Sequence, residues 1–286
     1  MRVLVTGSSG RLGTAIVATL RPRHEVVGLD LSDGPMTTVR GSIEDRELVQ
    51  RVTRGIDAVV HTAALHAPHV GRYSRGEFVD ANVIGTLNLL EAGVASAMQR
   101  FVYTSTTSLY GSALVPTDRA VWVTEDLCPH PRDIYDATKL AAEELCRDFA
   151  RGGLPTVRLR VARYFSESPE QTAVHRLSRA VDIRDAAAAH ALAVEWVGTS
   201  GTFNVAARSP FDESDLEELL TDAAAVIRRR VPWAEAAFAS RGWTLPRRIE
   251  RVYVTAKAQA ELGFRPVHNI ESLLGETGCR REASAR

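Results

Sequence analysis

Residues 2–13 read RVLVTGSSGRLG, and this stretch decides the fold. An apolar run at 3–5 leads into three glycines, Gly7, Gly10 and Gly13. This order predicts a strand, a tight turn and the start of a helix, whose free amides and dipole attract an anion. Gly7 then permits the turn, Gly10 lets the backbone approach a pyrophosphate, and Gly13 lets the helix pack close to the sheet. A glycine-rich turn without a ligand is the alternative interpretation.

The segments that follow alternate between helix and strand patterns. The spacing of apolar residues predicts a helix over 11–20 and a strand over 24–30. Two strands joined by one helix form a right-handed crossover and lie parallel. A helix over 44–54 and a continuous apolar strand over 56–62 come next. The chain is therefore predicted to be an α/β protein built on a Rossmann-type, doubly wound parallel sheet.

Asp30 stands at the end of the second predicted strand, seventeen positions after Gly13. A carboxylate at this place accepts hydrogen bonds from the ribose hydroxyls of an adenosine and repels a 2′-phosphate. No arginine follows directly to offset that repulsion, so the residue favours NAD over NADP. A turn or helix-cap aspartate is the alternative interpretation.

The loop after the third predicted strand is a candidate substrate contact. The strand ends in three small residues: Thr62, Ala63 and Ala64. They leave room for a flat cofactor, although they also permit close helix packing. The loop 65–72 follows, with His66, His69 and Arg72 at the edge of the sheet where such folds bind ligands. Substrate contact and simple solvation are both open for the histidines, and no metal site is expected.

A helix predicted over 133–150 carries Tyr135 and Lys139, which lie four residues apart and so on one face. Tyrosine is a poor base at neutral pH, and a neighbouring ammonium favours its phenolate. Thr106, in the hydroxyl-rich run after a strand over 100–104, can then hold a substrate oxygen while Tyr135 moves its proton. A chance Tyr-x-x-x-Lys pattern is the alternative.

The rest of the chain suggests how the domains are divided. Strand patterns over 156–161 and 202–205 flank an alanine-rich helix over 181–197, and the composition changes from Pro210 onward. We predict an NAD-binding domain over 1–165, to which the segment at about 181–206 returns, a small C-terminal substrate-binding lobe from 166–180 and 207–276, and a disordered tail over 277–286.

Composition excludes several classes of partner. Lysine plus arginine and aspartate plus glutamate are both 35, so neither nucleic acid nor an anionic membrane is expected as the main partner. Three scattered cysteines, Cys128, Cys146 and Cys279, predict free thiols rather than a disulfide framework or a zinc site. With no membrane-spanning run and no signal peptide, we expect a cytoplasmic protein with a small-molecule substrate.

Taken together, these motifs resemble the extended short-chain dehydrogenase/reductases, in particular the NAD-dependent epimerase/dehydratase family. Residues 6–13 are similar to its TGxxGxxG turn, residues 101–111 to its strand with a catalytic Ser or Thr before VYG, and residues 135–139 to its YxxxK pair. Residues 257–266 are similar to its closing KAxxxLGxxP motif. The resemblance covers residues 1 to about 270.

The resemblance implies a role for each matched residue. Tyr135 would be the acid/base, Lys139 would lower its pKa and hold the nicotinamide ribose, and Thr106 would bind the reacting oxygen. The expected NAD-binding residues are Gly7, Ser9, Gly10, Arg11, Leu12, Gly13, Asp30, Ser42, Ile43, Thr62, Ala63, Ala64, Asn82, Thr104, Tyr135, Lys139 and Tyr164. The expected substrate-binding residues are His66, His69, Thr106, Thr107 and Ser166.

Three departures from the family pattern bear on the cofactor and substrate. Ser42, before Ile43, stands where many members place an acid beside the adenine. Ser166 replaces the Asn of an RYFN motif that helps to hold a nucleotide-sugar phosphate. Only fifteen residues separate Ser166 from Asp182, where nucleotide-sugar enzymes carry a longer insertion.

The sequence thus predicts an NAD-dependent oxidoreductase or epimerase of carbohydrate metabolism that acts by hydride transfer at a carbinol carbon of a sugar-like substrate, with or without a nucleotide. A dehydrogenase or reductase of a smaller polyol or hydroxy-ketone is one alternative, and a non-catalytic NAD-binding regulator is another. The resemblance also implies a homodimer that pairs the helices predicted over 77–97 and 133–150 into a four-helix bundle.

Overall fold

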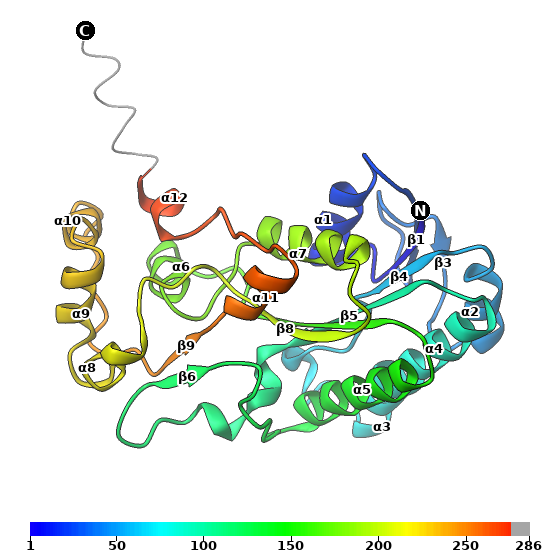
Figure 1. Ribbon diagram of the computed structural model, residues 1–286, viewed down its shortest axis with the longest axis horizontal. Helices are drawn as coiled ribbons and strands as arrows, with labels where there is room; N and C mark the ends of the chain where they lie inside the picture. The colour runs from blue at the N-terminus through cyan, green and yellow to red at the C-terminus, as the bar shows by residue number, and fades with distance from the viewer. Residues whose placement is uncertain (276–286) are drawn as a thin grey trace, which may run out of the picture.

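A seven-stranded parallel sheet forms the centre of the protein (Figure 1). The structure is a computed structural model and describes residues 1–275. The strands follow the order β3-β2-β1-β4-β5-β7-β8. Their bounds are β1 Arg2–Thr6, β2 Glu25–Asp30, β3 Val39–Arg40, β4 Ala58–His61, β5 Arg100–Thr106, β7 Thr156–Val161 and β8 Gly201–Val205. The predicted Rossmann-type fold is confirmed, and the strand order reverses between β1 and β4, where such sheets bind ligands.

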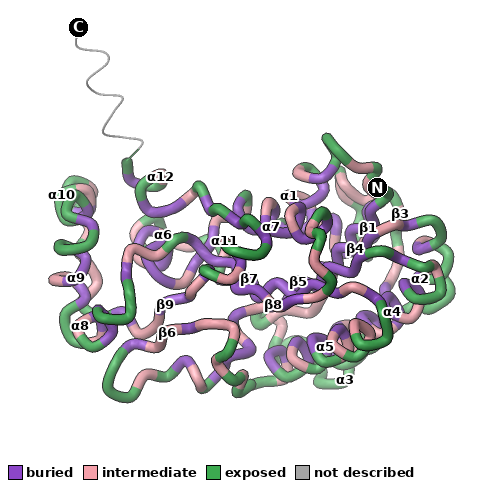
Figure 2. The backbone as a smooth tube through the Cα atoms, viewed as in Figure 1, coloured by how far each residue is buried: buried purple, intermediate pink, exposed green. Residues whose placement is uncertain are grey.

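Helices cover both faces of this sheet (Figure 1). One face carries α1 (Arg11–Leu20) and α7 (Ile183–Glu195), and the other carries α2 (Arg46–Val52), α4 (Gly85–Ala95) and α5 (Ile134–Arg151). Side chains along a strand alternate between the faces. Val3 and Val5 therefore join the core beside α1, whereas Leu4 joins the core on the opposite face. The central strands are buried as a result, as the purple segments of Figure 2 show.

The long helix predicted over 77–97 is interrupted. It consists of α3 (Arg75–Val79), a π-helical turn (Asp80–Ile84) and α4, which ends at Ala95. The turn holds Asn82, whose buried amide bonds to the backbone of Leu65 and to the hydroxyl of Thr138. A π turn inserts one residue into a helix, and the spacing of apolar residues does not reveal such an insertion.

A second hydrophobic core lies beyond the sheet. It includes Leu177, Phe211, Leu216, Phe238 and Val252. The elements around this second core are α6 (Pro169–Arg176), α8 (Leu216–Thr221), α9 (Ala223–Arg230), α10 (Ala234–Ala239), β9 (Arg251–Tyr253) and α12 (Ile270–Gly275). Helix α11 (Ala256–Glu261) instead packs on β8 and joins the core of the sheet. Strand β6 (Val121–Val123) pairs with β9 in parallel. Short 3₁₀ turns lie at Ala67–His69, Thr107–Tyr110, Ser112–Leu114 and Glu213–Asp215.

The structure does not test every prediction made from the sequence. The boundaries of the two predicted domains stay a prediction, and the tail predicted over 277–286 lies outside the described residues. Cys128 and Cys146 are free thiols, and Cys279 also lies outside the described residues. No helix within residues 1–275 is long and apolar enough to cross a membrane.

Candidate active site

A cavity of about 1,050 Å³ opens at the carboxyl ends of the sheet strands. Its wall contains the glycine turn after β1, Asp30 from β2, Thr62 after β4 and Thr104 from β5. Apart from Asn82 and Ser166, every residue expected from the sequence to be catalytic or to bind NAD or substrate lines this cavity, whereas Arg72 of the candidate loop does not. Motifs that are far apart in the chain therefore meet where the strand order reverses.

The two exceptions lie beside the wall. The Asn82 Oδ1 atom accepts a hydrogen bond from the Leu65 amide at 2.8 Å, and its Nδ2 atom donates to the Leu65 carbonyl at 3.0 Å. Asn82 thus fixes a wall residue from behind. Ser166 directly follows Phe165, which does line the cavity. The cofactor contact of Asn82 and the substrate contact of Ser166 stay predictions.

The glycine turn forms an open cradle at the start of α1. Gly7 has a φ of 71°, and a Cβ there would lie 2.7 Å from Thr62 Oγ1. A Cβ on Gly13 would lie 2.0 Å from the Gly7 carbonyl oxygen, so packing requires both glycines. A Cβ on Gly10 would meet only that oxygen, at 3.2 Å, so packing alone does not explain this glycine. No side chain caps α1, and the cradle fits a phosphate bound by the free helix amides.

Asp30 is fixed at the edge of the cradle by two backbone amides. Its Oδ2 atom accepts from the Ser9 amide at 2.9 Å, and its Oδ1 atom accepts from the Ser32 amide at 2.9 Å. The first bond ties the carboxylate to the glycine turn, and the second supports the turn after β2. Each oxygen keeps a lone pair for a further donor, such as a ribose hydroxyl.

Tyr135, Lys139 and Thr106 converge in the cavity wall. The Lys139 Nζ atom donates to the Thr104 carbonyl oxygen at 2.6 Å and lies 4.2 Å from the centre of the Tyr103 ring. A hydrogen bond joins the side chains of Tyr135 and Thr106. Lys139 and Tyr135 of α5 are thus bonded to Thr104 and Thr106 at the end of β5. This places a phenol, a hydroxyl and an ammonium group together.

Burial dominates the ionisation of these groups. It raises the pKa of Tyr135, an effect that the hydrogen bond from Thr106 partly offsets. It also lowers the pKa of Lys139 to about 7. The spacing of the two residues predicts that Lys139 favours the Tyr135 phenolate, but burial outweighs such an effect while the ammonium is bonded to the Thr104 carbonyl.

The two predicted histidines of the loop lie together next to Tyr135. The His66 amide donates to His69 Nδ1 at 3.0 Å, and the ring centres of His66 and Tyr135 are 6.2 Å apart. Burial, with smaller contributions from Lys139 and His69, lowers the pKa of His66 to about 4. His66 is therefore a neutral imidazole at neutral pH, which can both donate and accept a hydrogen bond.

The cavity has a positively charged end that the sequence analysis missed. Arg179 and Arg251 both line it. Arg179 Nη2 bonds to His175 Nε2 at 2.5 Å, and within residues 1–275 no ion pair joins Arg179 to a carboxylate. Arg251 Nη2 pairs with Glu250 at 2.9 Å, while its buried Nε atom has no partner in the described chain. Burial and then the charge of Arg251 lower the pKa of Arg179. This end therefore attracts an anion.

No local pattern marks these two arginines. Arg179 lies in the turn after α6, and Arg251 lies in β9, some seventy positions later. The packing of β9 against the turn after α6, where the Tyr253 amide donates to the Ser178 carbonyl at 2.9 Å, brings them to one cavity. Arg163, by contrast, belongs to a motif that the sequence analysis singled out, and it also lines the cavity, where it pairs with Glu167 at 2.5 Å.

Comparison with known proteins gives the family. A sequence model described as the NAD dependent epimerase/dehydratase family matches residues 3–201. The chain belongs to this family. The predictions of the family, of an enzyme and of NAD as the cofactor are confirmed with it. Expectations for the individual site residues stay predictions.

Relatives in the epimerase/dehydratase family have different named substrates. A 3-beta-hydroxysteroid dehydrogenase of Mycolicibacterium neoaurum is 38% identical over 157 residues, which are 50% of this chain and 42% of that protein. A dTDP-glucose 4,6-dehydratase of Streptomyces antibioticus is 30% identical over 321 aligned residues, covering 97% of this chain and 91% of that protein. The chain spans about half the length of the first curated relatives it matches.

Among solved structures, a short-chain dehydrogenase/reductase superfamily protein from Agrobacterium tumefaciens with bound NAD is similar over the whole chain. The TM-score is 0.72 and the identity 26%, and the alignment covers 100% of this chain and 98% of that one. Over the described residues, the fold of this family member is therefore similar to that of a protein solved with NAD.

Proposed function

We propose that this protein is an NAD-dependent oxidoreductase or epimerase that acts at a carbinol carbon of a sugar-like substrate. The observation that carries the proposal is the meeting of Tyr135, Thr106 and Lys139 in one cavity wall with the glycine turn. A protein that only binds NAD has no need of a buried tyrosine beside a hydroxyl and an ammonium group. This set therefore supports an enzyme over the regulator that the sequence left open.

The residues of the cavity fit NAD. The open cradle at Gly10 and the uncapped start of α1 would hold the pyrophosphate, and Asp30 would hold the adenosine ribose. Lys139 would hold the nicotinamide ribose. When bound, NAD supplies the acceptor for a hydride from the substrate carbon.

Tyr135 is the group that moves the proton in this proposal. Its Oη atom takes the proton of the substrate hydroxyl when the carbon is oxidised, and it returns that proton in the reverse direction. The Thr106 hydroxyl bonds to the same substrate oxygen and fixes its distance from Tyr135. Because burial raises the pKa of Tyr135, the free protein holds the phenol protonated, which is the form that donates a proton in the reducing direction. In the oxidising direction Tyr135 must first release this proton to solvent through the cavity, and the charged form of Lys139 would favour the resulting phenolate.

The charged end of the cavity supports a substrate with an anionic substituent. Arg179 and Arg251 can donate to a carboxylate or a phosphate there, since a buried anion must be paired. Thr107, His66 and His69 provide neutral partners for hydroxyl groups. A nucleotide sugar and a smaller sugar acid or phosphate both have this chemistry.

A dehydrogenase of a smaller substrate is the second candidate, and one observation favours it. The segment between Ser166 and Asp182 folds into the single short helix α6, so no long insertion covers the cavity at this place. Free UDP or GDP should therefore bind only weakly to the NAD-loaded protein. Calorimetry tests this, and a micromolar dissociation constant for either nucleotide would show that a nucleotide pocket exists.

Product analysis tests the proposed reaction. The purified protein is incubated with NAD and with three groups of compounds: nucleotide hexoses, sugar acids or sugar phosphates, and neutral polyols. We expect conversion of an anionic compound, seen as an epimer by NMR or as NADH by absorbance, and no conversion with Tyr135→Phe. Conversion of neutral polyols alone would contradict the anionic substituent, and equal conversion by Tyr135→Phe would contradict the mechanism.

We also propose a homodimer that pairs the α3–α4 segment and α5. Val79, Ile84 and Val94 are apolar side chains of the first segment that are exposed in the single chain, and pairing would cover such residues. A monomer mass in light scattering at micromolar concentration would contradict this arrangement. Location in the cytoplasm stays a prediction.

A further inference from the structure

A buried glutamate lies on the face of α5 that carries Tyr135. Glu143 comes one helical turn after Lys139 and two turns after Tyr135, so the three side chains share a face. The Glu143 side chain is 0% exposed, yet the residue does not line the cavity. A buried carboxylate is costly unless it is paired, so its partners should explain its presence.

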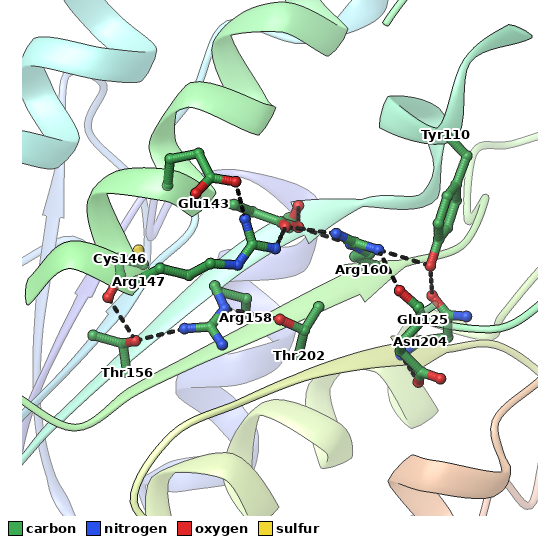
Figure 3. Close-up of polar contacts among 12 residues, drawn as sticks. Tyr110, Glu125, Glu143, Cys146, Arg147, Thr156, Arg158, Arg160, Thr202 and Asn204 are labelled. Carbon is green, nitrogen blue, oxygen red and sulfur yellow. Dashed lines mark hydrogen bonds and ion pairs between the residues drawn. The ribbon is translucent and has the colours of Figure 1, made fainter. Parts of the chain in front are cut away.

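Four donors surround the Glu143 carboxylate, three of them from arginines drawn in Figure 3. Its Oε1 atom accepts from Ser105 Oγ at 2.6 Å and from Arg160 Nε at 3.0 Å. Its Oε2 atom accepts from Arg160 Nη2 at 2.8 Å and from Arg147 Nη2 at 2.9 Å. Burial opposes ionisation, but the bonds from Arg160 and Ser105 lower the pKa of Glu143 overall. Glu143 and Arg160 therefore form a bidentate ion pair.

The partners of Glu143 belong to the strands that carry the site. Ser105 and Arg160 stand opposite each other on β5 and β7, so both reach the same carboxylate. The residue before Ser105 accepts the hydrogen bond of Lys139, and the residue after it bonds to Tyr135. Three consecutive residues of β5 thus each hold one side chain from the same face of α5.

Arg160 is itself held at its other end. Its Nη1 atom donates to the Tyr110 hydroxyl at 3.0 Å, and its guanidinium carbon lies 4.9 Å from the centre of that ring. The Tyr110 hydroxyl in turn donates to Asn204 Oδ1 at 2.8 Å, and Asn204 stands opposite Arg160 on β8. Figure 3 shows this line of contacts from α5 across the sheet. Arg160 cannot move without breaking it.

We propose that Glu143 and Arg160 are positioning residues, which hold α5 against β5 so that Lys139 and Tyr135 keep their places in the cavity. This inference rests on the proposed function, because that function assigns Lys139 to the cofactor. Stability alone is a weak reason for such a pair, since apolar residues of similar volume often replace a buried ion pair without loss. A directional, bidentate bond fixes the position of a helix in a way that apolar contact does not.

NADH binding to the whole protein tests the inference without any substrate. The double variant Glu143→Leu/Arg160→Met removes the pair and fills its volume. We expect the dissociation constant for NADH, followed by its fluorescence, to rise about tenfold, the usual effect of losing one hydrogen bond from a charged group. Lys139→Met should raise it by a similar factor.

The combination of these changes decides whether the pair acts through Lys139. In a protein that already carries Lys139→Met, removal of the pair should add little, because the contact that it positions is gone. Fully additive effects would overturn the inference. Suppose that the wild-type protein converts no compound of the substrate panel, while the effects of the pair and of Lys139→Met on NADH binding are still not additive. This result would count against the proposed function alone.

Arg158→Met is a matched control. Arg158 is a buried arginine of the same strand, two residues before Arg160, and it bonds to Thr156 and Thr202 rather than to Glu143. Its loss should lower the melting temperature and leave NADH affinity within the error of the wild type. If Arg158→Met weakens NADH as much as the double variant, the pair has only a general structural role and the inference is wrong.

A milder variant covers the case in which the double variant does not fold. Ser105→Ala removes one donor from Glu143 and leaves the ion pair in place. We expect a smaller rise in the NADH dissociation constant, which Ser105→Thr should reverse because it restores the hydroxyl. Wild-type affinity in a folded Ser105→Ala protein, together with a double variant that does not fold, would overturn the inference.

Discussion

The two ends of the cavity are built in different ways. The cofactor end comes from one continuous stretch, the glycine turn and α1, together with Asp30 from the next strand. The end that we propose for the substrate combines Arg179, Arg251 and His66, which come from separate segments of the chain. Local spacing can encode the first end, whereas only the completed fold creates the second. In the function proposed here, substrate specificity therefore depends in part on two arginines that carry no local signal, whereas the loop motif already indicated His66.

Tyr135 lies between the two ends, and its loss should have the largest effect. Tyr135→Phe removes the hydroxyl that moves the proton, so turnover should fall by roughly two to four orders of magnitude. NADH affinity should stay near the wild-type value, because the cradle is untouched. Steady-state rates and a fluorescence titration measure both, and near wild-type turnover would remove Tyr135 from the mechanism.

Substitutions of Gly13 and Gly10 distinguish a glycine required for packing from one required for contact with the cofactor. A Cβ on Gly13 meets the Gly7 carbonyl at 2.0 Å, so Gly13→Ala should destabilise the protein by about 1–3 kcal/mol or more, as overpacking does. A Cβ on Gly10 has one close contact, with the Gly7 carbonyl oxygen at 3.2 Å, so Gly10→Ala should lower the melting temperature far less than Gly13→Ala and yet weaken the binding of NADH. Thermal melts and titrations test the pair, and wild-type NADH affinity in Gly10→Ala would show that no phosphate approaches there.

The same contrast explains what the sequence could predict. The order of strands and helices follows from periodicity, and the common face of Tyr135 and Lys139 follows from their spacing, because both depend on neighbours in the chain. The place of Thr106 beside Tyr135 was instead implied by the resemblance to the family. The π turn that holds Asn82 was missed since one inserted residue does not disturb a helical pattern visibly. The partners of Glu143 were missed because Arg160 is its neighbour only across the sheet.

The arginines should distinguish substrates by charge. Arg251→Met removes a guanidinium whose buried Nε atom has no partner in the described protein. For an anionic substrate, KM should rise by roughly ten- to a hundredfold, the effect of losing a charged hydrogen bond worth about 1.5–3 kcal/mol. Neutral substrates should be unaffected. Arg248→Met is the control, because Arg248 pairs with Glu250 at 3.7 Å and does not line the cavity.

Low pH should reduce the stability of the folded protein through His61, which lies beside the cofactor end of the cavity. This buried residue bonds to Thr6 Oγ1 at 2.7 Å and to Thr86 Oγ1 at 3.0 Å, and burial, then the charge of Lys139, lowers its pKa to about 3. The unfolded chain has a histidine pKa of about 6.5, so it binds the proton first as the pH falls. The His61 contribution is complete above about pH 6.5 and declines by up to about 1.4 kcal/mol per pH unit toward pH 3.

Urea unfolding as a function of pH measures this decline. His61→Asn should have a flatter profile than the wild type over the whole acidic range. His66→Asn, at the other end of the cavity, should flatten the profile only down to about pH 4, where the wild-type His66 becomes protonated. Identical profiles for the wild type and His61→Asn would show that this histidine does not control acid stability.

Asp30 gives the smallest effect and tests how a single residue can serve both the fold and the ligand. Its two oxygens accept bonds from Ser9 and Ser32, so Asp30→Ala loses turn contacts as well as a ribose acceptor. NAD affinity should fall about tenfold, as expected for one charge-assisted bond, while the affinity for NADP should change little because the repulsion of its 2′-phosphate is also removed.

Asp30→Asn is the matched variant, since its amide keeps an acceptor without the charge. It should retain more NAD affinity than alanine and also bind NADP better than the wild type does. An unchanged ratio of NAD to NADP affinity in both variants would show that Asp30 only stabilises the turn. The cofactor preference would then have to come from other residues of the cradle.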